Sequence, residues 1–382
     1  MANYDYEIVN GRKIRVRPKE TVSEIDKNGY FRRQPNHFTT PFGDGENDLK
    51  AEGNKRYRLV WAKLCHWSNR AAIVRELEGL EDQISVNMVE HAPHEKNLGW
   101  EYVYNENNID PVFGDQFLSE AYYRADDDYQ GRTTVPALID TATGKVVNND
   151  YNWLTTYFEV NFRPWHKKGA PELYPVELRE EIDKMNLWLF DNINNAVYRS
   201  SFSRSNEGHF DGVNTFYAAM DRLEKRLETN RFLFGDYVTD SDIRLYVTLA
   251  RLDIRYTAQL GETKRPLYNY KNLWGYAKEL WEIPAFAHHT DFAAIIRQGR
   301  IEGEEDGFRA STHYDLALPK IDWDAQWKVS TERAYLSSDP THPIYLGNNR
   351  RFDIDPTWYD LGAESPKKEE KETPPSCGCC CG

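Results

Sequence analysis

The chain has 382 residues, enough for two domains that each bury a core of their own. Its formal net charge is −13, and no stretch dense in Lys and Arg offsets this acidity, so binding to the phosphate backbone of nucleic acids is not expected. No apolar stretch is long enough to cross a membrane, and the first residues lack a signal-peptide pattern, so we expect a cytoplasmic protein. Aromatic residues make up 14%, which fits either a ring-rich core or rings around an aromatic, quinone-like ligand.

The first half of the chain predicts an arm followed by an α/β unit. Residues 1–54 mix charge, Gly and Pro with little periodicity, so we expect an extended arm that wraps the body, without a specific role. A strand over 57–64, a helix over 66–79 and a strand over 84–90 then form a βαβ unit. This unit opens a thioredoxin-like domain expected over 55–165.

Cys65 stands where the first strand gives way to the helix, and it is the only cysteine before residue 377. A thiol at a helix N-terminus meets unpaired backbone N–H groups and the positive end of the helix dipole, which both favour the thiolate. Because Ser68 occupies the second position of a C-x-x-C pattern, a mixed disulfide at Cys65 needs another thiol to resolve it. The pattern predicts one-cysteine thiol transfer; a small buried core residue is the alternative.

Two further features complete the predicted α/β domain. Residues 91–132 form a polar insertion, longer than an ordinary connection and therefore functional or partly mobile, with Trp100 as a candidate pocket wall. A strand over 133–140 contains Pro136, and 144–147 reads as its hairpin partner. Proline cannot donate in a central ladder, so Pro136 marks the start or edge of this strand. Two interpretations stay open: a cis-proline loop that faces the cysteine and leaves the Val135 backbone free to pair with a thiol peptide, or an ordinary trans proline.

From about residue 172 the pattern becomes helical, with no intervening strand pattern. Apolar residues recur with helical spacing at about 174–200, 212–230, 239–257 and 270–282. We therefore expect an all-helical domain over 172–330 and an extension over 331–382. In Thr239-Asp240-Ser241-Asp242, Thr239 is expected to cap a helix and Asp242 to reach back to the N–H of the cap. This motif concerns folding, and no chemistry is assigned to it.

A thioredoxin-like unit followed by a helical bundle is the arrangement of glutathione transferases, and the local motifs resemble one class of them. This class is the glutathionyl-hydroquinone reductases, the omega-like Xi-class transferases, and the resemblance spans roughly residues 50 to 295. The motifs that carry it are Glu52-x-Gly-x-x-Arg56-Tyr57, Cys65-x-Trp67-x-x-Arg70, Gly79-Leu80-Glu81, Gly99-Trp100, Gly131-Arg132-x-Thr134-Val135-Pro136, Asn148-Asn149, Val197-Tyr198, Arg231-Phe232-Leu233-x-Gly235-Asp236, Thr239-x-x-Asp242-Ile243-Arg244-Leu245 and Asn272-Leu273-Trp274-Gly275-Tyr276.

The resemblance implies a mechanism. Cys65 would attack the sulfur that joins glutathione to a hydroquinone, release the hydroquinone and hold glutathione as a mixed disulfide, which a second glutathione resolves. Tyr198 and Tyr256 match tyrosines expected near the hydroquinone, where a proton donor is needed; packing between helices is the alternative for both. The resemblance also implies a homodimer, with glutathione as cosubstrate and no tightly bound cofactor.

The implied thiol-binding residues are taken from the same motifs. They are Trp67, Trp100, Val135, Pro136, Asp150 and Tyr151.

Three departures from the family pattern bear on the substrate. His66 replaces a helix-starting proline; protonated, it would add positive charge beside Cys65, and a solvated first-turn histidine is the alternative. Asp150-Tyr151 replaces the Glu-Ser pair that grips the γ-glutamyl end of glutathione, which leaves open another low-molecular-weight thiol or a protein thiol. No tyrosine occurs in 295–299, where the family has one near the hydroquinone.

The C-terminus carries a second group of thiols after the charged linker 364–372. These are Cys377, Cys379, Cys380 and Cys381. Three interpretations stay open: a soft-metal clip, although the spacing differs from paired C-x-x-C zinc sites; a tethered reductant for Cys65 on a linker that spans at most roughly 45 Å; or a solvated tail without a defined role.

The sequence therefore predicts a thiol-dependent reductase or transferase with Cys65 as its nucleophile. Its partners would be a small-molecule thiol and an aromatic, quinone-type substrate. Two alternatives are a noncatalytic or stress-related protein that keeps the transferase fold and a metal-handling protein that uses the C-terminal cysteines.

A deletion tests whether the tail takes part in thiol exchange. Removal of residues 377–382 should lower turnover severalfold when the external thiol is limiting, because a tethered thiol acts at a high effective concentration. Full-length and truncated proteins should turn over equally when the external thiol is saturating. Equal steady-state rates under the limiting condition as well would contradict the hypothesis.

Overall fold

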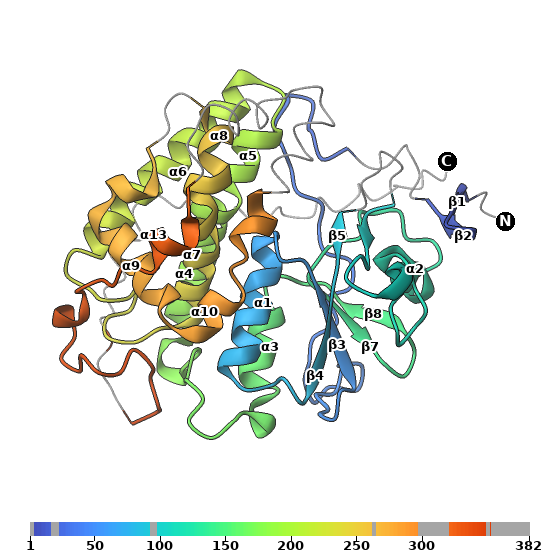
Figure 1. Cartoon of the computed structure of the whole chain (residues 1–382), viewed down its shortest axis with the longest axis horizontal. Helices are drawn as coiled ribbons and strands as arrows, with labels where there is room; N and C mark the ends of the chain where they lie inside the picture. Colours follow the sequence, from blue (N-terminus) through green and yellow to red (C-terminus); the bar gives the residue numbers. More distant parts are fainter. Residues whose placement is uncertain are drawn as a thin grey trace, which may run out of the picture.

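The computed structural model describes residues 4–16, 23–91, 98–261, 265–296, 321–348 and Phe352. Figure 1 shows a sheet-containing region formed by the first half of the chain and a helical region formed by the second half. This is the α/β thioredoxin-like arrangement followed by a helical bundle that the sequence predicts. The predicted Cys-rich tail and its linker lie outside the described residues.

A four-stranded mixed sheet, in the order β4-β3-β7-β8, forms the centre of the first region. Its elements are β3 (Tyr57–Trp61), α1 (His66–Leu77), β4 (Ile84–Met88), β7 (Ala137–Asp140) and β8 (Lys145–Asn148), followed by α3 (Leu154–Val160). The strands β3 and β4 are parallel, as the predicted βαβ unit requires, and β3–β7 and β7–β8 are antiparallel. All residues of β3 are buried, because helices cover both faces of the sheet: α1 and α3 on the side of the bundle and α2 on the other (Figure 1).

Pro136 explains why the strand predicted over 133–140 is shorter in the structure. The residue has no N–H to donate, so the ladder begins one residue later, at Ala137. The Val135–Pro136 peptide bond is cis. Of the two interpretations that the sequence left open, the cis-proline loop is the one confirmed.

The described part of the insertion over 91–132 is packed against the body and contains regular elements. It contains β6 (Trp100–Glu101), which pairs with β5 (Glu90–His91), then η1 (Glu106–Asn108) and α2 (Leu118–Ala125). Its rings fill an apolar cluster on the face of the sheet opposite α1: Tyr102, Tyr122 and Tyr129 are all buried there. Only residues 92–97 of the insertion lie outside the description.

The N-terminal arm contains a hairpin, β1 (Tyr6–Val9) and β2 (Arg12–Arg15), that the sequence analysis did not predict. Its turn residues Asn10 and Gly11 both have positive φ, 51° and 78°. A two-residue turn of this kind matches the twist of a hairpin, and Asn-Gly is its preferred sequence. The signal was therefore present in the printed sequence. Beyond the hairpin the arm does follow the body: the backbone of Phe38 pairs with that of Asn149.

The second region is a helical bundle built around α7, all of whose residues are buried. In chain order the helical elements of this half are η2 (Arg163–Trp165), η3 (Val176–Leu178), α4 (Arg179–Leu189), the π-helical η4 (Phe190–Asn194), α5 (Ala196–Phe202), α6 (Asn206–Arg226), α7 (Asp240–Arg251), the π-helical η5 (Leu252–Tyr256), α8 (Thr257–Gln259), η7 (Leu267–Asn269), α9 (Lys271–Trp281), α10 (Pro284–His288), α13 (Trp323–Trp327) and η8 (Ala334–Leu336). Two of the four predicted helices, those over 174–200 and 239–257, are thus interrupted by π-helical turns. Such turns occur often at functional sites.

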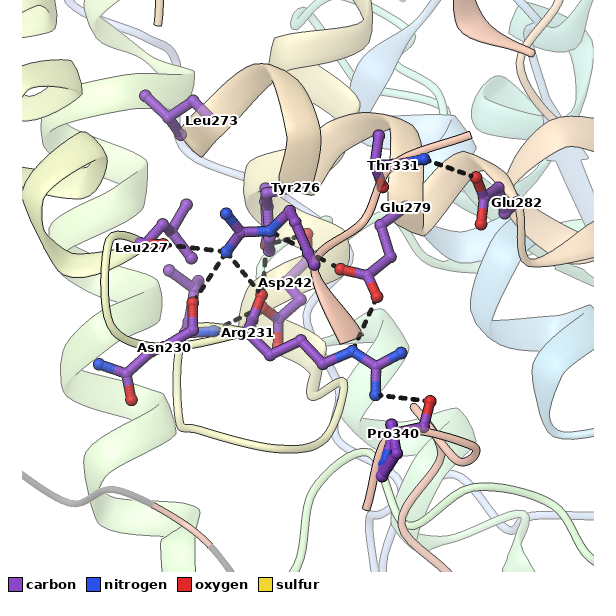
Figure 2. A network of polar contacts seen from close by, with 12 residues as sticks. Leu227, Asn230, Arg231, Asp242, Leu273, Tyr276, Glu279, Glu282, Thr331 and Pro340 are labelled. Atoms are coloured by element: carbon purple, nitrogen blue, oxygen red, sulfur yellow. Dashed lines mark hydrogen bonds and ion pairs between the residues drawn. The ribbon is translucent and has the colours of Figure 1, made fainter. Parts of the chain in front are cut away.

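The predicted capping box at the start of α7 is present and extends into a buried network. The Asp242 carboxylate accepts hydrogen bonds from the backbone N–H groups of Thr239 (2.8 Å) and Leu233 (2.9 Å) and from the hydroxyl of Tyr276 (2.8 Å). Nearby, Arg333 donates to the carbonyls of Leu227 and Asn230, as Figure 2 shows. These contacts attach the segment that follows the bundle to the loop between α6 and α7.

Removing the Asp242 carboxylate should therefore destabilise the whole bundle. Asp242→Ala leaves several buried donors without an acceptor, so we expect the free energy of unfolding to fall by about 2–4 kcal/mol. Urea unfolding at pH 7, followed by circular dichroism, measures this difference. Glu228→Ala is the matched control, because Glu228 is exposed on the loop after α6; a comparable loss in both variants would contradict the assignment.

Candidate active site

Cys65 lies at the N-cap position of α1, after the short turn that follows β3. Its own carbonyl accepts a hydrogen bond from the N–H of Asn69, so the thiol sits at the open end of the helix. The partly buried thiol donates to the carbonyl oxygen of Val135 at a distance of 3.7 Å. The structure thus brings together the predicted nucleophile and the cis-proline loop, 70 residues later in the chain.

Arg251, from the last turn of α7, fixes the turn that presents Cys65. Its Nε donates to the carbonyl of Leu64 (2.9 Å) and its Nη2 to the carbonyl of Lys63 (3.2 Å). The side chain is fully buried, and within the described residues it forms no ion pair with a carboxylate. Burial lowers the pKa of Arg251, and the nearby Tyr256 and Cys65 act against that shift. A buried positive charge therefore lies close to the thiol.

His66 is buried rather than solvated, which corrects both interpretations of this residue. Its Nδ1 lies 3.2 Å from the Tyr256 hydroxyl and 3.3 Å from the Thr248 hydroxyl. Burial lowers the His66 pKa well below 6.5, and the positive charges of Arg251 and Arg33 lower it further. The imidazole is therefore neutral at physiological pH, and it contributes no charge to a thiolate at Cys65. The reason is that the first turn of α1 packs beneath α7 and η5 instead of facing water.

The two candidate tyrosines meet at this histidine. Tyr256, in η5, is buried, and burial raises its pKa well above 10, so its hydroxyl keeps its proton. The Tyr198 ring lies 5.2 Å from the His66 ring, and the Trp67 ring lies 4.2 Å from it, measured between ring centres. The residues Trp67, Tyr198 and Tyr256, predicted from three separate motifs, therefore lie around one side chain that is adjacent to Cys65.

Asp150 and Tyr151 form the turn beside this cluster. The Tyr151 ring packs against the Trp67 ring with centres 4.6 Å apart, and the Tyr151 carbonyl accepts a hydrogen bond from Arg70 of α1. One oxygen of Asp150, Oδ1, accepts hydrogen bonds from the Asn152 N–H (3.1 Å) and from the Asn36 amide of the arm (2.9 Å). The turn thus keeps a carboxylate next to a ring that fills the aromatic cluster.

Trp100 occupies a different place from the other candidates. Its ring stacks on His91, with centres 3.9 Å apart, and it belongs to the apolar cluster that contains Val135 and against which Cys65 packs. It therefore lies on the cis-proline side of the thiol, away from the cluster of Trp67 and Tyr198.

The structure adds one residue to this site that the sequence analysis missed: Arg33, from the N-terminal arm. Its guanidinium carbon lies 4.4 Å from the ring centre of Tyr198 and 5.1 Å from that of Trp67. Its Nε donates to the side-chain oxygen of Asn195 (3.0 Å). No local pattern could have revealed this placement, because the arm has little periodicity and the contacts span more than 160 residues.

Two properties of the described residues bear on the remaining predictions. No group of three or more His, Cys, Asp or Glu side chains there could hold a metal ion, and the four tail cysteines lie outside that part of the chain. No helix in the same ranges is both long and apolar enough to span a membrane.

Comparison with known proteins identifies the class. The fold is that of a glutathione transferase, and the family "Glutathione S-transferase, C-terminal domain" matches residues 197–279. A glutathione S-transferase omega-like 2 of Schizosaccharomyces pombe is 34% identical, over 70% of this chain and 88% of the relative. The glutathionyl-hydroquinone reductase YqjG of Escherichia coli is 33% identical, over 63% of this chain and 73% of the relative.

Solved structures agree with this result. The glutathione-bound structure of YqjG superposes with a TM-score of 0.65 at 30% identity, covering 78% of this chain and 96% of that one. The chain belongs to the glutathionyl-hydroquinone reductases, the Xi-class glutathione transferases. It is an enzyme of the glutathione-transferase type, a thiol-dependent oxidoreductase.

The burial of His66 predicts how the free energy of unfolding depends on pH. Because the folded pKa lies below 6.5, the unfolded chain binds a proton there that the folded protein does not. The contribution of neutral His66 to the free energy of unfolding is therefore fully present above pH 6.5. As the pH falls below that value, this contribution decreases by about 1.4 kcal/mol per pH unit. His66→Gln should lack this contribution, so the difference in unfolding free energy between wild type and variant should shrink from pH 7 to pH 5. Parallel pH curves for the two proteins would contradict a neutral buried His66.

Proposed function

We propose that this enzyme reduces thiol conjugates of aromatic, quinone-type compounds, with Cys65 as the nucleophile and glutathione or another low-molecular-weight thiol as cosubstrate. The observation that carries the proposal is the Cys65 thiol, placed at the open N-terminus of α1 and facing the Val135 carbonyl beside a cis proline. The Escherichia coli relative is named a glutathionyl-hydroquinone reductase and has a glutathione-bound structure. The name and the bound structure of this relative both support glutathione and a hydroquinone conjugate as substrates here.

The first step is displacement at sulfur. The Cys65 thiolate attacks the sulfur of the conjugate, and a sulfur–sulfur bond forms as the bond between that sulfur and the aromatic carbon breaks. The electron pair of the broken bond leaves with the ring carbon, which takes up a proton, so the ring is reduced while the two sulfurs are oxidised to a disulfide. A second thiolate then attacks the mixed disulfide, forms a disulfide with the bound thiol and returns Cys65 as thiolate.

Two sources of positive charge lie at the Cys65 sulfur. The first N–H groups of α1 and its dipole place partial positive charge at the sulfur. The buried guanidinium of Arg251 adds a full charge without a competing carboxylate among the described residues. The nucleophile therefore depends on α1 and α7 together, and the neutral His66 takes no direct part in its charge.

The hydroxyls of Tyr256 and Tyr198 are the proposed polar groups on the aromatic side of the site. Tyr256 holds its proton, since its pKa is raised, and its oxygen lies 3.2 Å from Nδ1 of His66. In this arrangement His66 orients the Tyr256 hydroxyl. Trp67 and Tyr151 supply the apolar faces against which the ring of a conjugate would pack.

The thiol would bind along the cis-proline loop and the turn after β8. The residues proposed for this role are Trp67, Trp100, Val135, Pro136, Asp150 and Tyr151. Asp150 offers a carboxylate to an amino group of the thiol, while the Tyr151 ring takes the place of a small hydroxyl. We also propose the domain division 55–165 and 172–330, the arm over 1–54 and a homodimer, on family membership alone.

The central test uses a protein whose only thiol is Cys65. Replacing Cys377, Cys379, Cys380 and Cys381 by Ser leaves one of the five cysteines. Incubation with a glutathionyl hydroquinone should then add one glutathione to the intact mass, and the further variant Cys65→Ser should add none. Turnover should fall by roughly three orders of magnitude or more in that variant.

Two controls define the outcome. Ser68→Ala removes the hydroxyl at the position of a would-be resolving cysteine and should leave adduct formation intact. Incubation with hydroquinone conjugates of cysteine and other small thiols in place of the glutathionyl hydroquinone identifies the preferred thiol by the mass that Cys65 retains. An adduct that persists in Cys65→Ser, or unchanged turnover there, would overturn the proposed mechanism.

A further inference from the structure

The segment of the arm around Arg33 is attached to the turn that carries Asp150 and Tyr151. The Phe38 N–H donates to the Asn149 side-chain oxygen (3.0 Å), and the Asn36 amide donates to Asp150 (2.9 Å). These bonds hold residues 33–38 along the turn after β8. The position of Arg33 among the rings of the site is therefore fixed by specific contacts on its C-terminal side.

Arg33 brings a positive charge that no carboxylate neutralises within the part of the chain that the structure describes. Its one hydrogen bond goes to the neutral amide of Asn195, and its Nη2 is enclosed without a hydrogen-bond partner among those residues. A buried donor left without an acceptor is unfavourable. Such a donor on a guanidinium favours an anionic oxygen as its partner.

The neighbouring residue shows what an ordinary surface arginine does in this segment. Arg32 points outward with a side chain 65% exposed, and it forms an ion pair with Asp26 at 3.0 Å. The two arginines thus differ in partner and in surroundings although they are adjacent in sequence. Only Arg33 faces the aromatic cluster.

The charges around Arg33 also set it apart from Arg32. In a chain of net charge −13, the site gathers Arg33 and Arg251, and both push the pKa of the buried His66 downward. Two positive side chains thus gather at this site although the protein as a whole carries a net negative charge. Such a grouping favours an anionic partner there.

We propose that Arg33, with Asn195, forms a subsite for a negatively charged substituent, a carboxylate or a phenolate, on the aromatic ring of the substrate. The assignment to an aromatic ligand rests on the proposed function. The position of the charge follows from geometry: the guanidinium lies 4.4 Å from the ring centre of Tyr198 and 5.1 Å from that of Trp67, so an anionic group bound to it would lie beside these rings.

Calorimetric titration with two ligands of the same shape tests the proposal. The ligands are 4-hydroxybenzoate, which carries a carboxylate at pH 7, and 4-hydroxybenzamide, which is neutral. The Cys65→Ser protein with Arg33 in place should bind the benzoate about 10-fold more tightly than the benzamide, the contribution of one partly desolvated charge pair of about 1.4 kcal/mol. Arg33→Gln should remove this preference, and Arg33→Lys should retain part of it.

Three comparisons make the result decisive. Arg32→Gln is the matched control and should keep the preference. Binding of the neutral amide should be the same in all proteins, which shows that the site is folded. If Arg33→Gln instead weakens binding of S-methylglutathione and leaves the benzoate unaffected, the charge serves the thiol and the assignment is wrong. An equal loss for both aromatic ligands, or a preference unchanged in Arg33→Gln, would also overturn it.

The titrations are carried out in the Cys65→Ser background, where no covalent step takes place. Their outcome is therefore independent of whether Cys65 is the nucleophile. A failure of the mass experiment would leave the anion subsite standing, and a failure of the titrations would leave the thiol chemistry standing.

Discussion

The placement of Cys65 depends on one buried guanidinium. Arg251 of α7 donates to the carbonyls of Lys63 and Leu64. These two acceptors lie in the turn between β3 and α1, outside the hydrogen-bond ladder of the sheet. A buried carbonyl without a donor is costly, so the helical region stabilises the turn that the α/β region cannot satisfy itself. Since Cys65 follows Leu64 directly, the two halves of the chain define the site only in combination.

Burial, reinforced by the same guanidinium, explains why His66, the residue after Cys65, is uncharged. A protonated His66 would stand among Arg251, Arg33, Arg255 and Arg70, all of which disfavour its charge. The neutral ring can instead accept a hydrogen bond at Nδ1, where the hydroxyls of Tyr256 and Thr248 lie within reach. The exchange of a helix-starting proline for histidine thus adds a polar link between α1, α7 and η5 without adding charge. We interpret it as a change in the aromatic side of the site.

Local patterns predicted the features that neighbours in sequence determine. The unit of β3, α1 and β4, the proline before β7 and the capping box of Thr239 and Asp242 each arise from a few adjacent residues, and each is present. The burial of His66 was not predictable, because its partners lie more than 180 residues away and a first-turn histidine is equally compatible with water. Arg33 gave no signal for the same reason. The hairpin at Asn10-Gly11 was missed although its turn signal is local.

The departures from the family pattern are connected through space. Tyr151, at a position where the family resemblance predicts a serine, packs on Trp67. Asp150, where the resemblance predicts a glutamate, is held by Asn36 of the arm, and Arg33 of the same arm faces Trp67 and Tyr198. If the residues of a binding site had changed independently of one another, buried polar groups would be left without partners, which lowers stability. Here the replaced residues and the arm satisfy one another, so we interpret the changes as a site adjusted to a different ligand shape around the same cysteine.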